Sequence, residues 1–356
     1  MAKIKVFISS YTTDLGWVQG KGLGIGSYHL DTETGDLALL STIETDNPSF
    51  LALHPSSDFL YANNEASHRK EASDDSISAF AIAEDGSLSL INQQPSHGAA
   101  PCFVSVERQG AFAFAANFNG GNVAVYPIAG NGALASISDN VSSDRMKADQ
   151  VTAHAHSITA SPSGRYLLVC DLGLDKVFIH RLDRQAGKLL PHGEFSTAKG
   201  SGPRHVSFHP SGQFVYLINQ DAGTITAFAW DDDQGLLSEL QTVATVPTDF
   251  KADPAASEIH AHPSGNWLYA SNRGHNSLVI FRIDPVRGLL NLVGFQPSLG
   301  VTPRNFSLTA SGELLLVGNQ DSDQVVVFRL DPESGELAEL NRQTVPTPVC
   351  VVCSPL

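Results

Sequence analysis

Apolar and polar residues alternate with a period of two along most of the chain, and short turns interrupt the alternation. One combination recurs: an apolar alternation, a turn such as Pro-Ser-Gly, and a second apolar alternation. "HVSFHPSGQFVYLINQ" at 205–220 and "NFSLTASGELLLVGNQ" at 305–320 are two copies. Further copies lie at 50–65, 103–118, 157–172 and 259–273. Their aligned turn residues, 47–54 positions apart, are Asp58, Gly110, Gly164, Gly212, Gly265 and Gly312. The sequence is therefore a repeat of strand-rich units, and no amphipathic helix is expected.

Each unit continues with a third alternating run, such as "QVVVFRLD", and a weaker fourth run, such as "GLLSELQTVA". Units of four short strands at this period are typical of a β-propeller. The C-terminal "PVCVVCSPL" predicts a lone first strand, and "KIKVFISSYTT" with "GLGIGSYHLDTETGDLALLSTIET" predicts the other three. A blade shared by the two chain ends would close the ring and remove its exposed edges. We therefore predict an all-β, seven-bladed propeller that spans 1–356 as one domain. Segments 138–150 and 247–257 are its longest predicted irregular insertions.

The composition limits the classes of partner that the protein could bind. The 356 residues include 37 acidic and 22 basic side chains, and the net charge of −15 opposes nucleic-acid binding. No apolar run approaches the ~18–20 residues of a membrane span, so no membrane partner is expected. The N-terminal "MAKIKVFISS" lacks the apolar run of a secretory signal, and we expect a cytoplasmic protein, monomeric or a weak homo-oligomer. Cys350 and Cys353 would face opposite sides of a strand, so neither a zinc site nor a disulfide is expected there.

The first strand of each propeller blade lines the central channel. Counting back from the turns gives the residue that opens each of these strands: Ser49, Cys102, His156, Arg204, Ser257, Arg304 and Val349. Packing alone requires small or apolar residues at this position. His156, Arg204 and Arg304 depart from that rule and are expected around one opening.

The ends of the second strands give two more aligned positions. The first holds Asn64, Asn117, Asp171, Asn219, Asn272 and Asn319, which fits a turn role for the side-chain amide or carboxylate. The next position varies: Glu65, Phe118, Leu172, Gln220, Arg273 and Gln320. A turn does not require Glu, Gln or Arg, so Glu65, Gln220, Arg273 and Gln320 are candidate site residues at the same mouth.

Arginine recognises carboxylate and phosphate through paired hydrogen bonds, so Arg204, Arg273 and Arg304 together predict a small anionic substrate. His154 and His156 share one face of the extended "HAHS". They could supply a general base or a metal pair, or only hydrogen-bonded channel residues. We favour His156 as the base and expect no metal or other cofactor.

Four further residues complete the candidates and exclusions. Glu258 could add a carboxylate or pair with an arginine, and His205 is expected to support Arg204. His209 and His262 belong to turns at the opposite mouth and are excluded from the site.

Four elements carry a family resemblance: "GSGPRHVSFHPSGQFVYLIN", "EIHAHPSGNWLYASNRG", "TPRNFSLTASGELLLVGNQDSDQVVVFRLD" and "AHSITASPSGRYLLVCDLGLDKV". They resemble the seven-bladed β-propeller lactonases, which include propeller-type 6-phosphogluconolactonases and the fungal carboxy-cis,cis-muconate lactonizing enzyme. The resemblance covers nearly the whole chain and implies that His156, Arg204 and Arg273 are active-site residues. Gln220 stands where the family commonly has Glu, so an acid or base role there would be lost or moved to Glu65 or Glu258. This departure favours lactone hydrolysis over cycloisomerisation.

The leading hypothesis is hydrolysis of a sugar-acid lactone, with 6-phosphogluconolactone first. The arginines would bind the anionic group and polarise the carbonyl, and His156 would activate water. The alternatives are a lactonase for an unphosphorylated aldonolactone or aldarolactone, a carboxy-muconate cycloisomerase, a calcium-dependent lactonase propeller, and a non-catalytic propeller that binds macromolecules.

Overall fold

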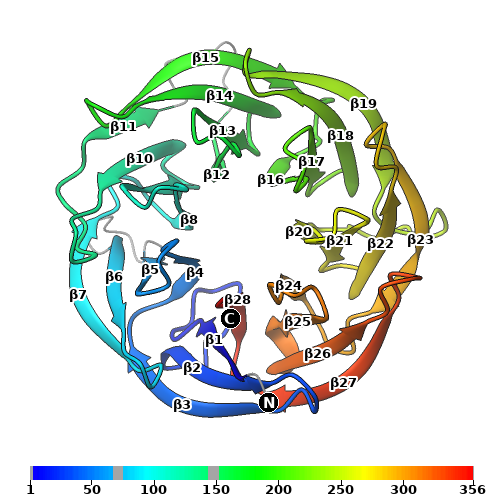
Figure 1. The fold of residues 1–356 in the computed structure, drawn as a ribbon, viewed down its shortest axis with the longest axis horizontal. Helices are drawn as coiled ribbons and strands as arrows, with labels where there is room; N and C mark the ends of the chain where they lie inside the picture. The colour runs from blue at the N-terminus through cyan, green and yellow to red at the C-terminus, as the bar shows by residue number, and fades with distance from the viewer. Residues whose placement is uncertain (1–2, 67–74, 143–151, 356) are drawn as a thin grey trace.

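Seven four-stranded antiparallel sheets form a closed ring around a central axis in the computed structural model (Figure 1). It describes residues 3–66, 75–142 and 152–355. The seven-bladed propeller predicted from the repeat is confirmed, and the only helix in these ranges is a single 3₁₀ turn, η2 (Gln320–Ser322).

The strands of each blade run from the axis outwards in a fixed order. The innermost strands are β4 (Pro48–Leu53), β8 (Pro101–Val106), β12 (Ala155–Ala160), β16 (Pro203–Phe208), β20 (Ala256–Ala261), β24 (Pro303–Leu308) and β28 (Pro348–Cys353). The second strands are β1 (Lys3–Ser10), β5 (Phe59–Asn64), β9 (Phe112–Asn117), β13 (Tyr166–Asp171), β17 (Phe214–Asn219), β21 (Trp267–Asn272) and β25 (Leu314–Asn319). The third strands are β2 (Gly24–Asp31), β6 (Ser76–Ile82), β10 (Asn122–Pro127), β14 (Lys176–Asp183), β18 (Thr224–Asp231), β22 (Ser277–Ile283) and β26 (Gln324–Leu330). The outermost strands are β3 (Leu37–Glu44), β7 (Leu88–Pro95), β11 (Asp139–Ser142), β15 (Lys188–Ser196), β19 (Leu236–Ala244), β23 (Leu290–Pro297) and β27 (Leu337–Thr344).

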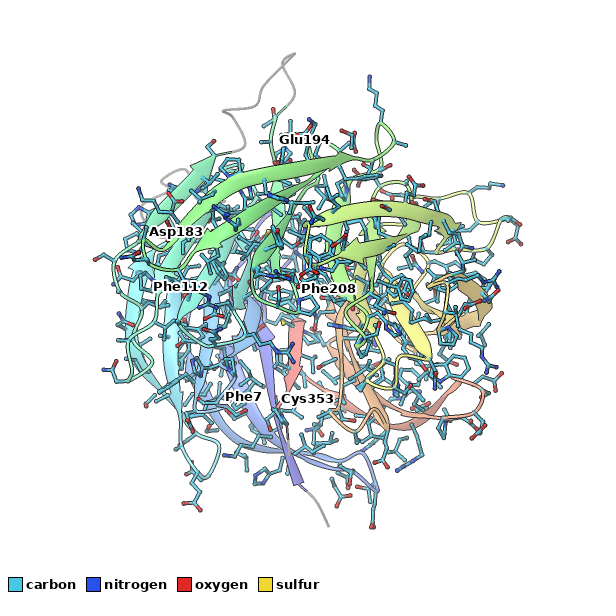
Figure 2. All side chains as sticks on the ribbon, turned by 45° about the horizontal axis from the view of Figure 1, so that its top comes forward. Phe7, Phe112, Asp183, Glu194, Phe208 and Cys353 are labelled. Atoms are coloured by element: carbon cyan, nitrogen blue, oxygen red, sulfur yellow. The ribbon has the colours of Figure 1, made fainter. Side chains whose placement is uncertain are left out.

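The two ends of the chain share one blade, as the sequence predicts. The C-terminal strand β28 pairs antiparallel with β1, and Ser9 lies opposite Cys350. Phe7 of β1 and Cys353 of β28 lie on these adjacent strands (Figure 2). Because this pairing gives β1 an inner neighbour, the blade formed by the two chain ends has four strands like the other six.

The core lies between neighbouring sheets. Every residue of β9, β13, β17, β21 and β25 is buried, because both faces of these strands pack against adjacent blades. The outermost strands are far more exposed, and β19 consists only of exposed and half-buried residues. Buried tyrosines link consecutive blades: Tyr61, Tyr216 and Tyr269 donate their hydroxyls to carbonyl oxygens of Gly132, Gly288 and Gly335 at 2.9, 3.2 and 2.8 Å.

The turns between first and second strands lie at the mouth opposite the one where the inner strands begin. There the Nε2 atoms of His54, His209 and His262 donate to the carbonyl oxygens of Gly110, Gly265 and Gly312 at 3.0, 2.9 and 2.9 Å. These bonds join neighbouring blades, so the assignment of His209 and His262 to structural turns is confirmed.

Two details of the predicted repeat are wrong. Ser57, not Asp58, occupies the turn position, because Ser57 has the positive φ of 63° that Gly212 and Gly265 share at 72° and 76°. Segment 138–150 is not wholly irregular, since β11 lies within it and pairs with β10; residues 143–151 lie outside the described ranges. The segment between β1 and β2, residues 11–23, is a long irregular connection that the repeat did not single out.

Candidate active site

An irregularity in every innermost strand shapes the channel. The pairing register breaks at the second residue of the strand, for example between Pro203 and His205 and between Pro303 and Asn305. In a regular strand, Arg204 and His205 would point to opposite faces. Instead, Nη1 of Arg204 lies 3.3 Å from both ring nitrogens of His205. The bulge therefore turns two consecutive side chains of one strand towards the same site.

The residue after each second strand lies at the same mouth in all seven blades. Its N–H donates to the carbonyl oxygen of the residue that precedes the innermost strand. These pairs are Tyr11–Thr347, Glu65–Asn47, Phe118–Ala100, Leu172–His154, Gln220–Gly202, Arg273–Ala255 and Gln320–Thr302. The predicted meeting of the two variable positions is confirmed, and Tyr11 is the seventh member that the sequence alignment lacked.

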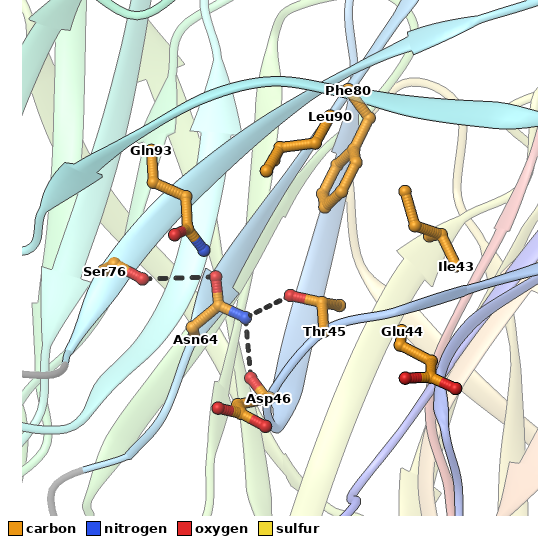
Figure 3. Close-up of a pocket in the computed structure, with 9 residues that line it drawn as sticks. All are labelled: Ile43, Glu44, Thr45, Asp46, Asn64, Ser76, Phe80, Leu90 and Gln93. Carbon is orange, nitrogen blue, oxygen red and sulfur yellow. Dashed lines mark hydrogen bonds between the residues drawn. The ribbon is translucent and has the colours of Figure 1, made fainter.

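The Asn position at the end of the second strand is structural. Asn117, Asn272 and Asn319 donate through Nδ2 to the carbonyl oxygens of Ser96, Thr245 and Ser298 at 3.0, 2.7 and 3.0 Å. Asn64 likewise holds Thr45 and Asp46 (Figure 3). Asn64 lines a pocket of about 380 Å³ whose lining includes no histidine or arginine, and this pocket contains none of the candidate site residues.

A second cavity, of about 220 Å³, lies at the mouth where the variable positions meet. It is lined by Trp17, Glu65, Ala100, Cys102, Phe118, Asn119, His156, Gln220, Arg273 and Arg304. Five of the ten sequence candidates therefore share one cavity. Arg204, His205 and Glu258 are buried next to it, and His154 and Gln320 are not among its lining residues.

The arginines bring positive charge to this cavity. Arg273 donates from Nη2 to the Gln220 amide oxygen at 2.7 Å and from Nε to the Ala255 carbonyl at 3.1 Å. Because an amide is neutral, Gln220 leaves the charge of Arg273 uncompensated where a glutamate would pair with it. Burial, with smaller contributions from Arg204 and Arg304, lowers the pKa of Arg273 well below its usual value. A guanidinium in this setting would be stabilised by a bound anion.

Arg204 is almost fully buried, with 4% exposed. Its Nη1 donates to the Ser257 carbonyl oxygen at 2.7 Å, while its buried Nε has no hydrogen-bond partner among the described residues. Burial first, and then repulsion from Arg304, lowers the pKa of Arg204 to about 10, so the side chain is still cationic at neutral pH. A buried cation with an unused donor is suited to a ligand oxygen.

His156 is also buried and stays neutral. Burial is the main cause that lowers its pKa well below 6.5, and Arg204, His205 and Arg304 add to it. Its Nδ1 lies 3.9 Å from Sγ of Cys102. Burial, then Glu65, raises the pKa of the Cys102 thiol to about 12, so this thiol is protonated at neutral pH. The imidazole can therefore accept a proton, and Cys102 is not an activated nucleophile.

Trp17 and Arg304 line one side of the cavity, and Tyr11 is buried behind Arg304; the sequence prediction identified Arg304 but neither Trp17 nor Tyr11. The Tyr11 hydroxyl donates to Oε2 of Glu65 at 2.9 Å and accepts from Nη2 of Arg304 at 3.1 Å. The Arg304 guanidinium lies 5.5 Å from the Tyr11 ring and 5.0 Å from the Trp17 ring. Tyr11 lies in the run "KIKVFISSYTT", which predicts a strand, and extending the variable position to the first blade identifies this residue.

His154 and Gln320 serve neighbouring segments. Nδ1 of His154 donates to the Phe118 carbonyl at 3.0 Å, and its ring stacks on Phe118 at 4.4 Å. Gln320 donates to Asp321 at 2.8 Å. Within the described ranges no three His, Cys, Asp or Glu side chains are grouped to hold a metal ion, so the metal-pair interpretation of His154 and His156 gains no support.

Comparisons with known proteins agree with this architecture. The family model described as "Lactonase, 7-bladed beta-propeller" matches residues 5–353. The 6-phosphogluconolactonase of Bacillus subtilis is 31% identical over 356 residues, covering 99% of this chain and 98% of the relative. That of Formosa agariphila is 33% identical over 319 residues, covering 86% and 87%. Among solved structures, the periplasmic gluconolactonase of Pseudomonas aeruginosa superposes with a TM-score of 0.90 at 31% identity, covering 99% of each chain. No helix in the described ranges has the length and apolarity needed to cross a membrane.

Proposed function

Because the chain belongs to the seven-bladed β-propeller lactonase family, we propose that it hydrolyses 6-phosphogluconolactone to 6-phosphogluconate. The protein is a lactonase, and the proposal concerns its substrate and the residues that act on it. One observation carries the proposal: a chain with a net charge of −15 places Arg273 and Arg304 in the lining of a cavity that also holds a neutral histidine, and buries Arg204 beside it.

The proposed reaction uses water as the nucleophile. Water attacks the lactone carbonyl carbon while the neutral imidazole of His156 takes one of its protons. The carbonyl oxygen becomes an oxyanion, and the cationic guanidinium of Arg204, buried beside the cavity, stabilises its charge. The ring C–O bond then breaks, the leaving oxygen takes the proton from His156, and the new carboxylic acid releases its proton to solvent to give an open-chain carboxylate.

The phosphate of the substrate would bind Arg273 and Arg304. Gln220 supports this preference, because its neutral amide leaves Arg273 free to balance an additional negative charge. Tyr11 and Trp17 hold the Arg304 guanidinium at the cavity wall. Two cationic side chains suit a phosphate dianion better than a neutral sugar hydroxyl.

An unphosphorylated aldonolactone is the second candidate substrate, since the Pseudomonas relative is described as a gluconolactonase. The cycloisomerase and the non-catalytic binding protein have no supporting observation in the described residues. Hydrolysis of 6-phosphogluconolactone would place the enzyme in the pentose phosphate pathway. We propose a cytoplasmic location for that reason, although one relative is periplasmic.

A substrate panel tests the proposal. The purified protein is mixed with 6-phosphogluconolactone or glucono-δ-lactone, with and without EDTA, and acid release is measured above the spontaneous rate. We expect faster turnover of the phosphorylated lactone and no effect of EDTA. Equal turnover of both lactones would refute the phosphate assignment, loss of activity in EDTA would refute the metal-free mechanism, and no turnover would refute the proposed substrate.

A further inference from the structure

A second ring of side chains lies one residue further along the innermost strands. It consists of Phe50, Phe103, Ser157, His205, Glu258, Asn305 and Cys350. The His205 ring meets Phe50 and Phe103 edge-on, with ring centres 5.7 and 5.0 Å away, and lies 5.1 Å from the His156 ring. These contacts join β4, β8 and β12 to β16 across the axis. His205 is therefore part of a packed layer that adjoins the cavity wall at His156.

Glu258 is the only carboxylate in this ring, and it is 3% exposed. Its Oε1 accepts the Nδ1–H of His205 at 3.0 Å, and its Oε2 accepts the Nδ2–H of Asn305 at 2.5 Å. The Asn305 amide oxygen in turn accepts the N–H of Val351 at 2.8 Å. This network connects four successive innermost strands, β28, β24, β20 and β16.

The backbone of β20 bulges next to Glu258. As in the other six innermost strands, the register gains one residue, and here Ser257 and Glu258 lie opposite the single residue Ser271. The N–H of Glu258 donates to the Ser271 hydroxyl at 3.0 Å. A bulge of this kind redirects the side chains beside it, and in β20 one of these side chains is the Glu258 carboxylate.

The network ends at Arg204. The Glu258 carboxylate holds His205 through Nδ1, and Nη1 of Arg204 lies 3.3 Å from both nitrogens of the same ring. Burial and Arg204 lower the pKa of His205 to about 4 against the opposing effect of Glu258, so the guanidinium meets an uncharged ring. Glu258 also supplies the nearby negative charge that favours the cationic form of Arg204.

We propose that Glu258, acting through His205, is a positioning residue that holds the Arg204 guanidinium against the reacting lactone carbonyl. This inference rests on the proposed lactone hydrolysis. Asn305 completes the support by fixing the second carboxylate oxygen. Glu258 and His205 are thus assigned to orienting Arg204; His205 has the supporting role expected from the sequence, and Glu258 acts on the arginine through His205 instead of pairing with it directly.

A double-mutant cycle tests the proposal. In Glu258→Gln, only the amide oxygen can accept, so one of the two bonds from His205 and Asn305 is lost and the NH₂ group faces the other donor. The negative charge beside Arg204 is lost as well, so the ring and Arg204 lose their fixed positions. A misplacement of about 1 Å costs on the order of 100-fold in rate, so we expect kcat to fall by about 100-fold and KM to change by less than about threefold. In the Arg204→Ala background, Glu258→Gln should cost less than about threefold.

The matched control is Glu107→Gln, at a buried carboxylate that binds Arg184 at 2.6 Å and two backbone N–H groups, 2.7 Å each, at the opposite mouth. We expect kcat within about twofold of the parent in both backgrounds. An equal loss from Glu258→Gln with and without Arg204 would overturn the positioning role while leaving the lactonase assignment intact.

A measurement without turnover separates the two proposals. The Nε–H resonance of Arg204, assigned by its disappearance in Arg204→Lys, is recorded in ¹⁵N-labelled protein. We expect a sharp, slowly exchanging signal in the wild type and a broadened or fast-exchanging one in Glu258→Gln. An unchanged signal would overturn the inference even if the enzyme hydrolyses lactones. If the wild type shows no lactonase activity, the proposed function fails and this signal alone decides whether Glu258 positions Arg204.

Discussion

Replacing Tyr11 by Phe removes one buried hydroxyl that contacts two residues of the cavity wall, Glu65 and Arg304. That hydroxyl donates to Glu65 at 2.9 Å and accepts from Arg304 at 3.1 Å, so both lost bonds involve charged partners. A hydrogen bond to a charged group contributes about 1.5–3 kcal/mol. Arg304 would keep its position between the two aromatic rings, 5.5 and 5.0 Å away, where each cation–π contact contributes about 0.5–2 kcal/mol.

The expected net loss of transition-state binding free energy is therefore that of about one hydrogen bond to a charged group. It corresponds to a decrease of about 10- to 100-fold in kcat/KM for 6-phosphogluconolactone. Most of the decrease should appear in KM, because Arg304 is proposed to bind the phosphate. The assay is steady-state hydrolysis at pH 7.5, accompanied by a melting curve to confirm folding.

Tyr216→Phe is the matched control, since its buried hydroxyl donates only to the Gly288 carbonyl at 3.2 Å and lies outside the cavity. It should lower stability and leave kcat/KM within about twofold. The reasoning is refuted if folded Tyr11→Phe keeps the wild-type kcat/KM, or if both substitutions reduce it equally.

Three further outcomes follow from the titrating groups. Burial and neighbouring cations lower the pKa of His156 below 6.5, so the neutral imidazole persists in mild acid. We therefore expect kcat/KM to be constant from pH 8 to about 6. A fall in kcat/KM with a midpoint at or above pH 6.5 would contradict the assignment of His156 as the base. Burial likewise lowers the pKa of His262, so the stability from its neutral ring is full above about 6.5 and is lost as pH falls through the folded-state value. His262→Gln should then lower the free energy of unfolding in urea by about 1 kcal/mol at pH 7.5 and by less at pH 5. An equal loss at both pH values would show that protonation of His262 does not weaken its hydrogen bond to the Gly312 carbonyl. Finally, the pKa of Cys102, raised to about 12, predicts that iodoacetamide at pH 7 leaves activity unchanged, and rapid inactivation prevented by Cys102→Ser would show a reactive thiol.

The fold was predictable because every blade repeats the same physical solution. Period-two apolar runs and recurrent Pro-Ser-Gly turns determine four strands per unit, and the unmatched runs at the two ends determine the closure between β28 and β1. Aligned positions also brought Glu65, His156, Gln220, Arg273 and Arg304 to one cavity. Aligned residues of different blades lie at the same level along the axis of the ring. Comparing them therefore identifies which side chains meet at one mouth of the channel.

What could not be predicted depends on contacts between non-equivalent positions. Tyr11 and Trp17 reach the cavity from an irregular segment whose course no repeat specifies. The partnership of Glu258 with His205 and Asn305 joins three different blades at a bulge, which leaves no periodic signal in the sequence. His154 has the right residue type, but its ring bonds the Phe118 carbonyl instead of lining the cavity, which spacing alone does not reveal.

The central claim is that the arginine-lined mouth, and not the opposite one, hydrolyses the lactone. The most direct measurement is kcat/KM for 6-phosphogluconolactone in His156→Gln, Arg204→Ala and the matched control His209→Gln, whose ring bonds the Gly265 carbonyl at the other mouth. Loss of a general base or of an oxyanion donor typically costs about 10²–10⁴-fold. The account predicts decreases of that size for the first two variants and less than about twofold for the third. Wild-type kcat/KM in folded His156→Gln and Arg204→Ala would contradict it.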